Sequence, residues 1–339
     1  MKLKTTLLIT FLCLLSFDVW AQNSEFDVIK KRSFVACGTD LSTKSFAYTD
    51  ESGTWRGIDA DICRNFAAAI LGNSESFKLY DVPLSQSAQM LNNRSIDVML
   101  GNSSLSAKQE ALYLSAITDV LYFDRQVFVT RKQTNNVSMN DYKGAKVCVL
   151  NNSADFSNLS AYNSKYGMEF KILPFHNMNE VKQAFLLNRC ELACGSEIYF
   201  KGIEQTLVAK ENNLFVLPET ISIRPVYAYV SPLNLKLQKA GKWIINALKL
   251  ASENEINKNN IDAFASVKDS SVRNLLGFEP DLWTYFGLQP TWVVQAIKDR
   301  GNFEEMFETN LGSESHIKLD KRNNSLLKNG GMISSLPFI

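Results

Sequence analysis

Short apolar runs alternate with amphipathic stretches along the first part of the chain. The runs FVACGTD (34–40), FKLYDVPL (77–84) and IDVML (96–100) are predicted to be strands, because each is short, apolar and bounded by turn residues. The stretch GTWRGIDADICRNFAAAILG (53–72) is predicted to contain a helix, because its apolar residues recur at helical spacing and Gly72 ends it. Strands that alternate with helices predict an α/β domain with a mostly parallel sheet.

The same alternation continues after a strand predicted at 122–132, which leads the chain out of this first unit. The chain then crosses between two α/β units twice, near 128–132 and near 217–226. The elements expected after the first strand are a strand, a polar loop and a helix over 145–162, a strand at 170–175, a helix at 179–190, a strand at 191–195, two strands around Arg224 and Pro225 within 214–230, and a helix over 235–254.

Two α/β units with two crossings predict a hinged clamp that closes on a ligand. We expect residues 22–130 and 223–339 to form lobe 1 and residues 131–222 to form lobe 2. In parallel α/β sheets, ligands bind outside the carboxyl ends of the strands. The segment 101–108, which directly follows the strand at 96–100, is therefore expected at the ligand site.

The first 21 residues, MKLKTTLLITFLCLLSFDVWA (1–21), are typical of a secretory signal peptide. Two lysines form a basic start, the apolar run Leu7 to Phe17 is too short to span a bilayer, and residues 19–21 approximate a small-residue cleavage site. An N-terminal anchor helix is the alternative, and Asp18 together with the short apolar run argues against it. We therefore expect the mature protein to be exported.

The charge balance removes one class of partner. The leader holds two of the 36 basic and one of the 35 acidic residues, which leaves 34 of each in the mature chain. A chain without net charge gives no electrostatic reason to bind nucleic acid or an anionic membrane. The remaining length suits two domains or lobes of about 100–200 residues each.

Five of the six cysteines follow the leader, and export favours disulfides. By position, Cys37 is expected to pair with Cys63, and Cys148 with Cys190, each stabilising the fold by roughly 3–4 kcal/mol. Cys194 is left over, either buried or a competitor of Cys190. A zinc site is only weakly supported, because there is no CxxC motif and the chain has two histidines. We expect no metal and no cofactor.

Several segments resemble the periplasmic solute-binding proteins of amino-acid ABC importers (bacterial extracellular solute-binding proteins, family 3), in particular the general L-amino-acid-binding branch. The resemblance covers nearly the whole mature chain, and the four paired cysteines fall where that branch has cysteines. It implies a type II periplasmic-binding-protein fold, a small-molecule ligand, an inner-membrane permease as partner, and a monomer. The segments are GTWRGIDADICRNFAAAILG, RSIDVMLGNSS, YKGAKVCVLNNSADF, LLNRCELACGSE, LLGFEP, WVVQAIKDRGNFEEMFETNLGSES and KNGGM.

The resemblance also implies how lobe 1 holds an amino acid. The family grips the α-carboxylate with a hydroxyl and an arginine, and those positions carry Ser103 and Lys108 here, with Ser104 beside them. A bidentate arginine–carboxylate pair orients its target, and lysine lacks the planar fork. Lys108 could still neutralise a carboxylate. The aromatic cover over the ligand is expected at Phe46, or at Tyr48.

In lobe 2 the family's hydroxyl-rich loop falls on 152–154, where Ser153 keeps one hydroxyl. The aspartate that accepts from the α-ammonium falls on Ser196, which carries no charge. A buried unpaired charge costs several kcal/mol. An amino acid should therefore bind weakly unless Glu197, next to Ser196, or Asp155 supplies the missing carboxylate.

Each candidate also has an ordinary structural interpretation, which the sequence leaves open. These are a solvated lysine for Lys108, a helix cap for Ser103 and Ser104, a surface carboxylate at a helix start for Glu197, core packing for Phe46, and helix-dipole roles for Asp59 and Asp61.

Three functions are compatible with the sequence. The first is a receptor that delivers an amino acid or a related solute to a permease. The second is a diverged member of the family with a changed ligand, or with a sensor or partner-binding role. The third is a dehydratase-like enzyme on the same scaffold, which should have kept the carboxylate clamp. No Walker loop, dinucleotide fingerprint or HExxH motif occurs, so we expect the receptor, without catalytic residues.

Overall fold

The computed structural model describes residues 25–41, 44, 46–101, 116–131, 138–206, 214–279 and 281–338. The predicted signal peptide lies outside these residues, and so do Ser103, Ser104 and Lys108.

An eight-stranded mixed sheet runs through the molecule in the order β4-β1-β5-β10-β6-β9-β7-β8. At one end of the sheet, β1 is parallel to both of its neighbours, β4 and β5. At the other end, β7 is parallel to both of its neighbours, β8 and β9. The long antiparallel pair β6 and β10 joins the two ends. The strands are β1 Val35–Thr39, β4 Phe77–Asp81, β5 Val98–Met99, β6 Ala116–Thr130, β7 Lys146–Leu150, β8 Lys171–Phe175, β9 Leu192–Ser196 and β10 Phe215–Val230, with a separate hairpin of β2 Tyr48–Thr49 and β3 Trp55–Arg56.

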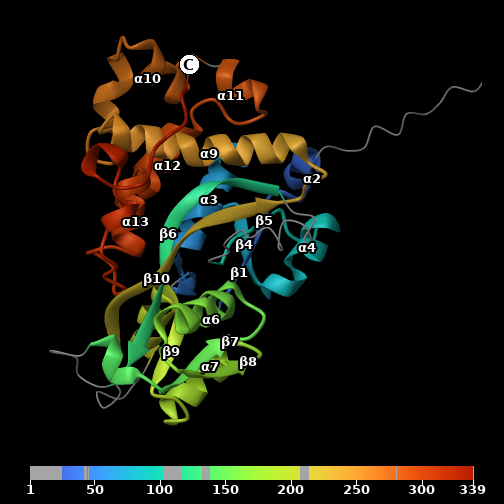
Figure 1. The fold of residues 1–339 in the computed structure, drawn as a ribbon. Coiled ribbons are helices and arrows are strands. Elements are labelled where there is room, and N and C mark those ends of the chain that lie inside the picture. Colours follow the sequence, from blue (N-terminus) through green and yellow to red (C-terminus); the bar gives the residue numbers. More distant parts are fainter. Residues whose placement is uncertain are drawn as a thin grey trace, which may run out of the picture.

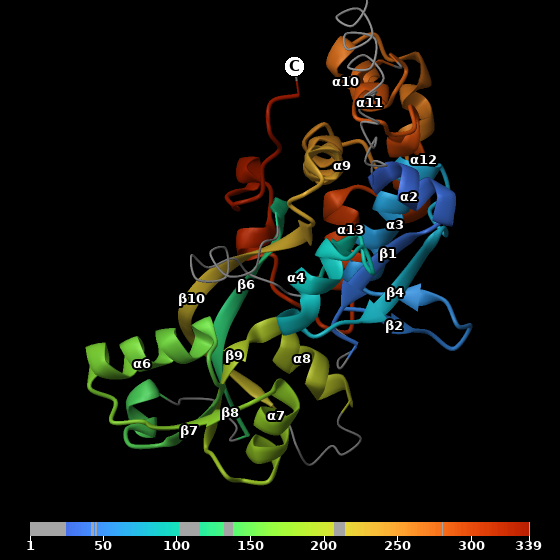
Figure 2. The same cartoon turned by 90° about the vertical axis from the view of Figure 1, so that its right-hand side faces the viewer.

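Helices pack around each end of the sheet and give two lobes, which β6 and β10 connect in both views (Figures 1 and 2). Lobe 1 carries α2 Glu25–Arg32, α3 Ile58–Leu71, α4 Leu84–Asn92, α9 Leu235–Glu253, α10 Ser270–Leu275, α11 Asp281–Tyr285, α12 Trp292–Arg300, α13 Phe303–Asn310 and the short turns η2 Ile261–Ser266, η3 Arg322–Asn324 and η4 Leu327–Asn329. Lobe 2 carries η1 Met139–Tyr142, α6 Ala154–Tyr166, α7 Met178–Leu186 and α8 Glu197–Thr206. The expectation of an α/β fold with two lobes and two hinge crossings is confirmed.

Helix α3 forms the centre of lobe 1 because nearly all of its residues are buried. Gly57 precedes it with φ 106°, and a Cβ there would lie 2.2 Å from the carbonyl oxygen of Phe46. Gly72 ends it in the left-handed region at φ 74°. The glycines thus allow the close approach at the start of the helix and its sharp end.

The prediction of two strands around Arg224 and Pro225 is wrong, because β10 is continuous from Phe215 to Val230. Pro225 lies opposite Phe123 in the ladder, and the backbone N–H and C=O of Phe123 bond to the side chain of Asn324 instead of to β10. No ladder hydrogen bond is therefore lost at the proline. β6 also begins earlier than predicted, at Ala116.

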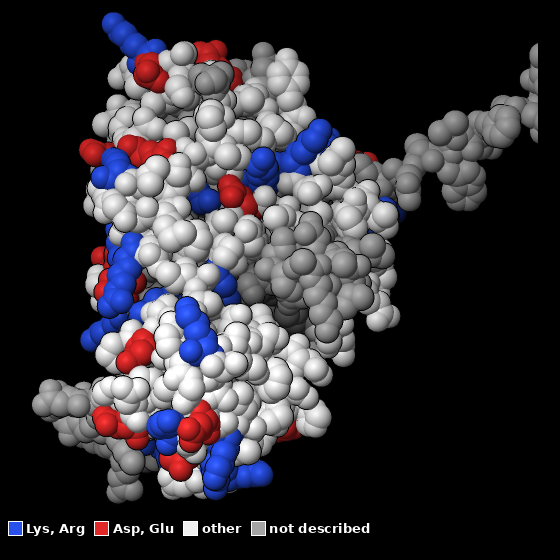
Figure 3. All heavy atoms as spheres, viewed as in Figure 1, with Lys and Arg blue, Asp and Glu red and all other residues white. Residues whose placement is uncertain are grey.

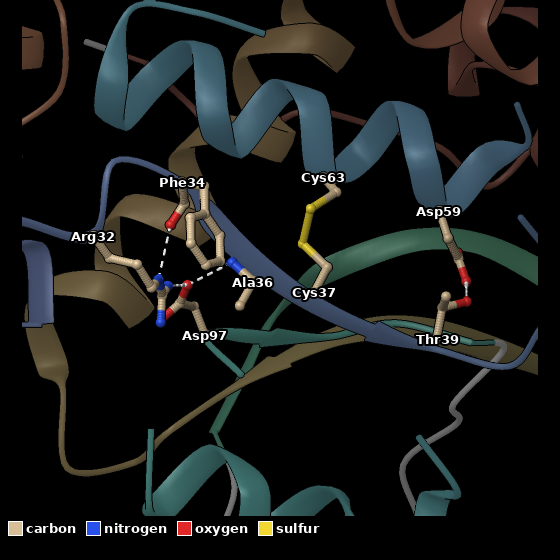
Figure 4. The surroundings of a disulfide bond; sticks show 8 residues. All are labelled: Arg32, Phe34, Ala36, Cys37, Thr39, Asp59, Cys63 and Asp97. Carbon is tan, nitrogen blue, oxygen red and sulfur yellow. Dashed lines mark hydrogen bonds and ion pairs between the residues drawn. A yellow bond between two sulfur atoms is a disulfide. The ribbon is translucent and has the colours of Figure 1, made fainter. Parts of the chain in front are cut away.

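Both expected disulfides are confirmed. Cys37, in β1, bonds to Cys63, in α3 (Figure 4). Cys148, in β7, bonds to Cys190 just before β9. Cys194 is buried without a disulfide, and its Sγ accepts a hydrogen bond from Nε2 of Gln126 at 3.2 Å.

The sheet directs the strand ends of both lobes toward the hinge. β5 pairs with β10 at Met99 and Tyr229, and β9 ends where Ser196 pairs with Gln126 of β6. The parallel strands of each lobe therefore have their carboxyl ends on the side of the central part of β6 and β10. Ligands bind beyond such ends in open α/β sheets, so this junction is the candidate site.

Candidate functional site

In lobe 1 a buried carboxylate holds the ends of two strands together. Oδ2 of Asp59, in the first turn of α3, accepts from Oγ1 of Thr39 at 2.5 Å and from N–H of Gly101 at 2.8 Å. Figure 4 shows Asp59 facing Thr39 at the end of β1. Asp59 therefore fixes Gly101, which precedes the segment with Ser103, Ser104 and Lys108. The interpretation of Asp59 as a helix-dipole residue alone is incomplete.

Asp59 is also chemically unusual. It is 0% exposed, and its Oδ1 has no hydrogen-bond partner in the described part of the chain. Burial raises the pKa of its carboxyl to about 7, although the hydrogen bonds from Thr39 and Gly101 act in the opposite direction.

At the hinge, one arginine joins three elements. Arg224, on β10, donates from Nη2 to Asp124 of β6 at 2.8 Å and from Nη1 to Asp155 of α6 at 2.9 Å. The side chain of Asp124 is fully buried, and those of Asp155 and Arg224 are 9% and 17% exposed. The three residues form the hinge triad.

The charges in the hinge triad act on one another. Burial alone would lower the pKa of the Arg224 guanidinium, but Asp155 and Asp124 outweigh burial and raise that pKa above its ordinary value. Burial raises the pKa of the Asp155 carboxyl, against the stabilising charge of Arg224. Three ionisable groups with little exposure are typical of a functional site or of a structural ion network.

Two hydroxyls predicted to contact ligand cap helices in lobe 2. Ser153 is the N-cap of α6, where its Oγ accepts from N–H of Phe156 at 3.1 Å and donates to the carbonyl of Leu150 at 2.6 Å. Oγ of Ser196, at the end of β9, accepts from N–H of Tyr199 at 3.0 Å. Both serines lie at strand ends facing the hinge, and their contact with ligand stays a prediction.

Glu197 is paired inside the protein. Arg125 of β6 donates to both of its carboxylate oxygens, at 2.7 and 2.8 Å, and Glu197 is 3% exposed. The alternative that Glu197 is a surface carboxylate is therefore wrong, although it does begin α8. A solute ammonium would have to compete with Arg125 for the carboxylate of Glu197. Asp155, the other candidate anchor, pairs with Arg224 in the hinge triad.

The aromatic side chain expected to cover the ligand is enclosed. Phe46 is 1% exposed and belongs to an apolar cluster that includes residues of both lobes. Tyr48, the second candidate, is half-buried and meets His316 edge-on at 5.6 Å between ring centroids. Core packing thus describes Phe46 in this arrangement.

Several buried polar atoms near the hinge lack a hydrogen-bond partner among the described residues. They are Oδ1 of Asp59, the hydroxyls of Tyr122 and Tyr199, and Nε of Arg224. Burial raises the pKa of both tyrosines, with the charges of Asp59 and Asp124 adding to it for Tyr122. Such atoms are rare in proteins and call for an explanation.

Sequence reasoning missed three of these residues as site candidates. In the sequence, Arg224 marks only an expected break beside Pro225. Asp124 lies in a strand of mostly large residues, and Tyr199 follows Glu197 in a predicted helix, so neither residue is singled out. The available signal was the pair of charges within the two strands predicted to be hinge crossings, since charges inside buried strands need partners.

The described residues contain no group of three or more His, Cys, Asp or Glu side chains placed to hold a metal ion. Within the same part of the chain, no helix combines the length and apolar character needed to cross a membrane. On the face drawn in Figure 3, basic and acidic residues of the described chain are interspersed.

The sequence matches the family model of bacterial extracellular solute-binding proteins, family 3, over residues 35–269. It is 30% identical over 309 residues to the putative amino-acid ABC transporter-binding protein YhdW of Escherichia coli (strain K12), with 90% of each chain covered. The general L-amino acid-binding periplasmic protein AapJ of Rhizobium johnstonii is 28% identical over 306 residues, covering 90% of this chain and 89% of that protein.

Solved structures agree. An ABC transporter periplasmic binding protein from Brucella ovis, with glutathione bound, superposes with a TM-score of 0.86 at 26% identity and covers 93% of this chain and 99% of its own. A solute receptor for L-cysteine from Neisseria gonorrhoeae, at 17% identity and a TM-score of 0.54, supports the fold alone; it covers 68% of this chain and 90% of that chain.

These matches give the chain the role of a substrate-binding component, which passes a small molecule to an ABC permease and catalyses no reaction. The matched region includes β1, α3, the hinge strands and all of lobe 2. The chain belongs to the bacterial extracellular solute-binding proteins, family 3.

Proposed function

We propose that this protein binds an amino acid or an amino-acid-like solute between its lobes and delivers it to the permease of an ABC importer. The observation that carries the proposal is the hinge triad, in which Arg224 joins Asp124 and Asp155 where the strand ends of both lobes meet. An amino acid presents an ammonium and a carboxylate, and a site with both signs of charge can pair with each.

The names of the relatives, and the ligand bound to one of them, indicate a class of solute. YhdW and AapJ are named for amino acids, and the similar Brucella ovis protein holds glutathione. Glutathione is a γ-linked tripeptide that carries an α-ammonium beside a carboxylate, as an amino acid does. We therefore propose α-amino acids and small γ-linked peptides as the ligand class.

In lobe 1 the solute carboxylate is assigned to Lys108, with the hydroxyls of Ser103 and Ser104. Asp59 supports this assignment, because it holds the N–H of Gly101 at the start of their segment. For the aromatic cover we favour Tyr48 over Phe46, whose ring is enclosed in the core.

In lobe 2 the solute ammonium is assigned to Asp155 and not to Glu197. Both oxygens of Glu197 already accept from Arg125, whereas Asp155 has one oxygen on Arg224. Ser153 and Ser196 lie beside this carboxylate in the same set of strand ends and supply neutral acceptors.

We also propose that residues 1–21 are removed as a signal peptide, so that the mature protein acts in the periplasm. The lobes are assigned to residues 22–130 with 223–339 and to residues 131–222. Strand pairing supports a pivot a few residues before the first boundary, since Gln126 already pairs with β9. Mass spectrometry of the periplasmic fraction tests the cleavage: an uncleaved N-terminus would contradict it.

Thermal unfolding of residues 22–339 against millimolar L-amino acids, glutathione and matched dicarboxylates without an ammonium tests the ligand class. Ligand at 100 times its dissociation constant adds about 2.7 kcal/mol to the free energy of unfolding, which raises Tm by several degrees. The Asp155→Asn variant should lose the shift, and Asp262→Asn, at an exposed carboxylate, should keep it. A shift with the dicarboxylates alone would mean a changed ligand class. No shift with any compound would favour a sensor or partner-binding role.

A further inference from the structure

The segment Ser315–Ser325, here named the C-terminal strap, is fixed to lobe 1. Lys321 pairs with Glu304 at 2.8 Å and with Glu308 at 3.5 Å, both on α13. The N–H of Leu319, within the strap, donates to the carbonyl of Leu311, just after α13, at 2.7 Å. The ion pairs and the backbone hydrogen bond together tie the strap to lobe 1.

The strap also reaches the hinge. Asn324 is 3% exposed, and its amide makes two reciprocal hydrogen bonds to the backbone of Phe123 in β6: Oδ1 accepts from the N–H at 2.7 Å, and Nδ2 donates to the carbonyl at 2.9 Å. In Figure 1 the red segment beyond α13 descends toward β10. The strap thus meets the central part of the hinge strands.

Phe123 has no strand partner for these groups. β9 pairs with β6 only from Gln126 onward, and the opposite residue on β10 is Pro225, which has no N–H. Buried backbone N–H and C=O groups require partners. The side-chain amide of Asn324 therefore takes the place of a neighbouring strand at the point where the chain passes between lobes.

The strap touches lobe 2 through polar contacts. Nζ of Lys201, on α8, donates to the carbonyl of Lys318 at 3.0 Å. Lys318 has φ 50°, in the left-handed region that non-glycine residues rarely adopt, so surrounding contacts hold its backbone in a strained form. The same Lys201 lies 3.9 Å from Glu197, which is paired with Arg125 of β6.

A cavity lies between Arg322 of the strap and lobe 2. Its volume is about 510 Å³ and its lining includes Arg125, Glu197, Lys201, the start of β10 at Leu214–Pro218, and Arg322 of the strap. Contact across this gap depends on one hydrogen bond and on partly exposed charges, whereas two ion pairs and a backbone hydrogen bond join the strap to lobe 1. The lobe 2 contact is the one that can open.

We propose that the C-terminal strap sets the balance between open and closed lobes. Asn324 is a positioning residue that fixes the pivot at Phe123, and the hydrogen bond from Lys201 to Lys318 is a latch that favours the observed arrangement. Neither residue is among those assigned to the solute. The proposal rests on the proposed function, since lobe closure on a solute is what the strap would bias, and any loss of closed molecules lowers apparent affinity in proportion.

Small-angle X-ray scattering of the solute-free chain 22–339 tests the latch. Lys201→Met removes the donor and keeps most of the side chain's volume. The equilibrium between lobe arrangements should shift about three- to tenfold away from the observed one, the effect of losing one hydrogen bond. Lys171→Met, on exposed β8, is the matched control and should leave the scattering curve unchanged. An unchanged curve for Lys201→Met would overturn the latch.

Hydrogen exchange at the amide of Phe123 tests the pivot. Asn324→Leu removes the acceptor at similar volume and should speed exchange there at least about tenfold, with a shift in the scattering curve; Asn323→Leu should do neither. If Asn324→Leu does not fold, Asn324→Asp keeps the acceptor for the Phe123 N–H and loses the donor, and should still shift the curve. Faster exchange without any shift would reduce Asn324 to a structural contact. Neither readout needs a ligand, so failure of the strap and failure of the receptor proposal are distinguishable.

Discussion

Nη1 of Arg224 donates to Oδ1 of Asp155 at 2.9 Å and so ties a hinge strand to the first turn of a helix in lobe 2. The two residues are 69 positions apart in the sequence. Because Asp155 begins α6 beside the strand ends of lobe 2, this contact brings the charge of the hinge into the candidate ligand site. The second bond of Arg224, to Asp124, holds the guanidinium in place.

Replacing Arg224 by Met should strongly destabilise the protein. The change leaves the carboxylates of Asp124 and Asp155 buried without a counter-charge, and breaking a buried ion pair in this way costs about 3–5 kcal/mol. Urea unfolding at pH 7 measures the loss. Arg273→Met is the matched control, because Arg273 pairs with Glu279 at the surface and should cost at most about 1 kcal/mol. Equal losses in the two variants would contradict a buried triad.

The Asp59→Asn variant should change how stability depends on pH. The pKa of Asp59 is raised from 3.8 to about 7 in the folded protein, so the native state binds more protons than the unfolded state between those values. The free energy of unfolding contributed by Asp59 is then fully present below about pH 4, falls as pH rises toward 7, and is constant above. Asn can still accept from Thr39 and Gly101, so the variant should lack this decline.

The measurement is the difference in unfolding free energy between wild type and Asp59→Asn at several pH values from 4 to 8. Wild type should lose up to a few kcal/mol relative to the variant across that window. Asp262→Asn, at an exposed carboxylate, should follow wild type. A difference that does not vary with pH would mean that Asp59 stays ionised throughout.

The strand and helix order could be predicted because it depends on local periodicity. The apolar run at 34–40 and the amphipathic stretch at 53–72 became β1 and α3, and the spacing of the cysteines agreed with both disulfides. The continuity of β10 could not be predicted, because Pro225 is tolerated where its partner Phe123 directs both backbone groups to Asn324, which is 201 residues away.

The candidate site was harder to predict for the same reason. Arg224 meets Asp124 across 100 positions, and Glu197 meets Arg125 across 72. Nothing in the sequence near Glu197 indicates that an arginine occupies both of its oxygens. The lobe 2 positions that match the family lie at strand ends that face the hinge. Which carboxylate there is free to bind a solute ammonium depends on these distant ion pairs.

Asp155 and Glu197 can be separated as ammonium anchors by matched neutral variants. Both are buried carboxylates that pair with an arginine, so Asp155→Asn and Glu197→Gln disturb comparable interactions. Asp155→Asn should weaken the binding of a responsive solute about 10- to 100-fold, because a charge-assisted hydrogen bond is lost. Glu197→Gln should leave affinity within about threefold. Titration calorimetry decides, and the reverse order would assign the anchor to Glu197.

Lys108→Ala should reduce solute affinity at least about 100-fold, because the solute carboxylate would lose its counter-charge. Lys108→Arg should keep binding, with an affinity that matches or exceeds that of wild type because of the planar fork of arginine. Lys171→Ala, on exposed β8, is the control for general loss of charge. Unchanged affinity in Lys108→Ala would remove Lys108 from the site.

The most direct test of the central claim is titration calorimetry of residues 22–339 with L-glutamate, other L-amino acids and glutathione, beside glutarate as a dicarboxylate without an ammonium. Saturable one-to-one binding is expected for at least one compound that carries an α-ammonium, is lost in Asp155→Asn, and does not occur with glutarate. Binding of glutarate alone, or of none of these compounds, would contradict a receptor for amino-acid-like solutes.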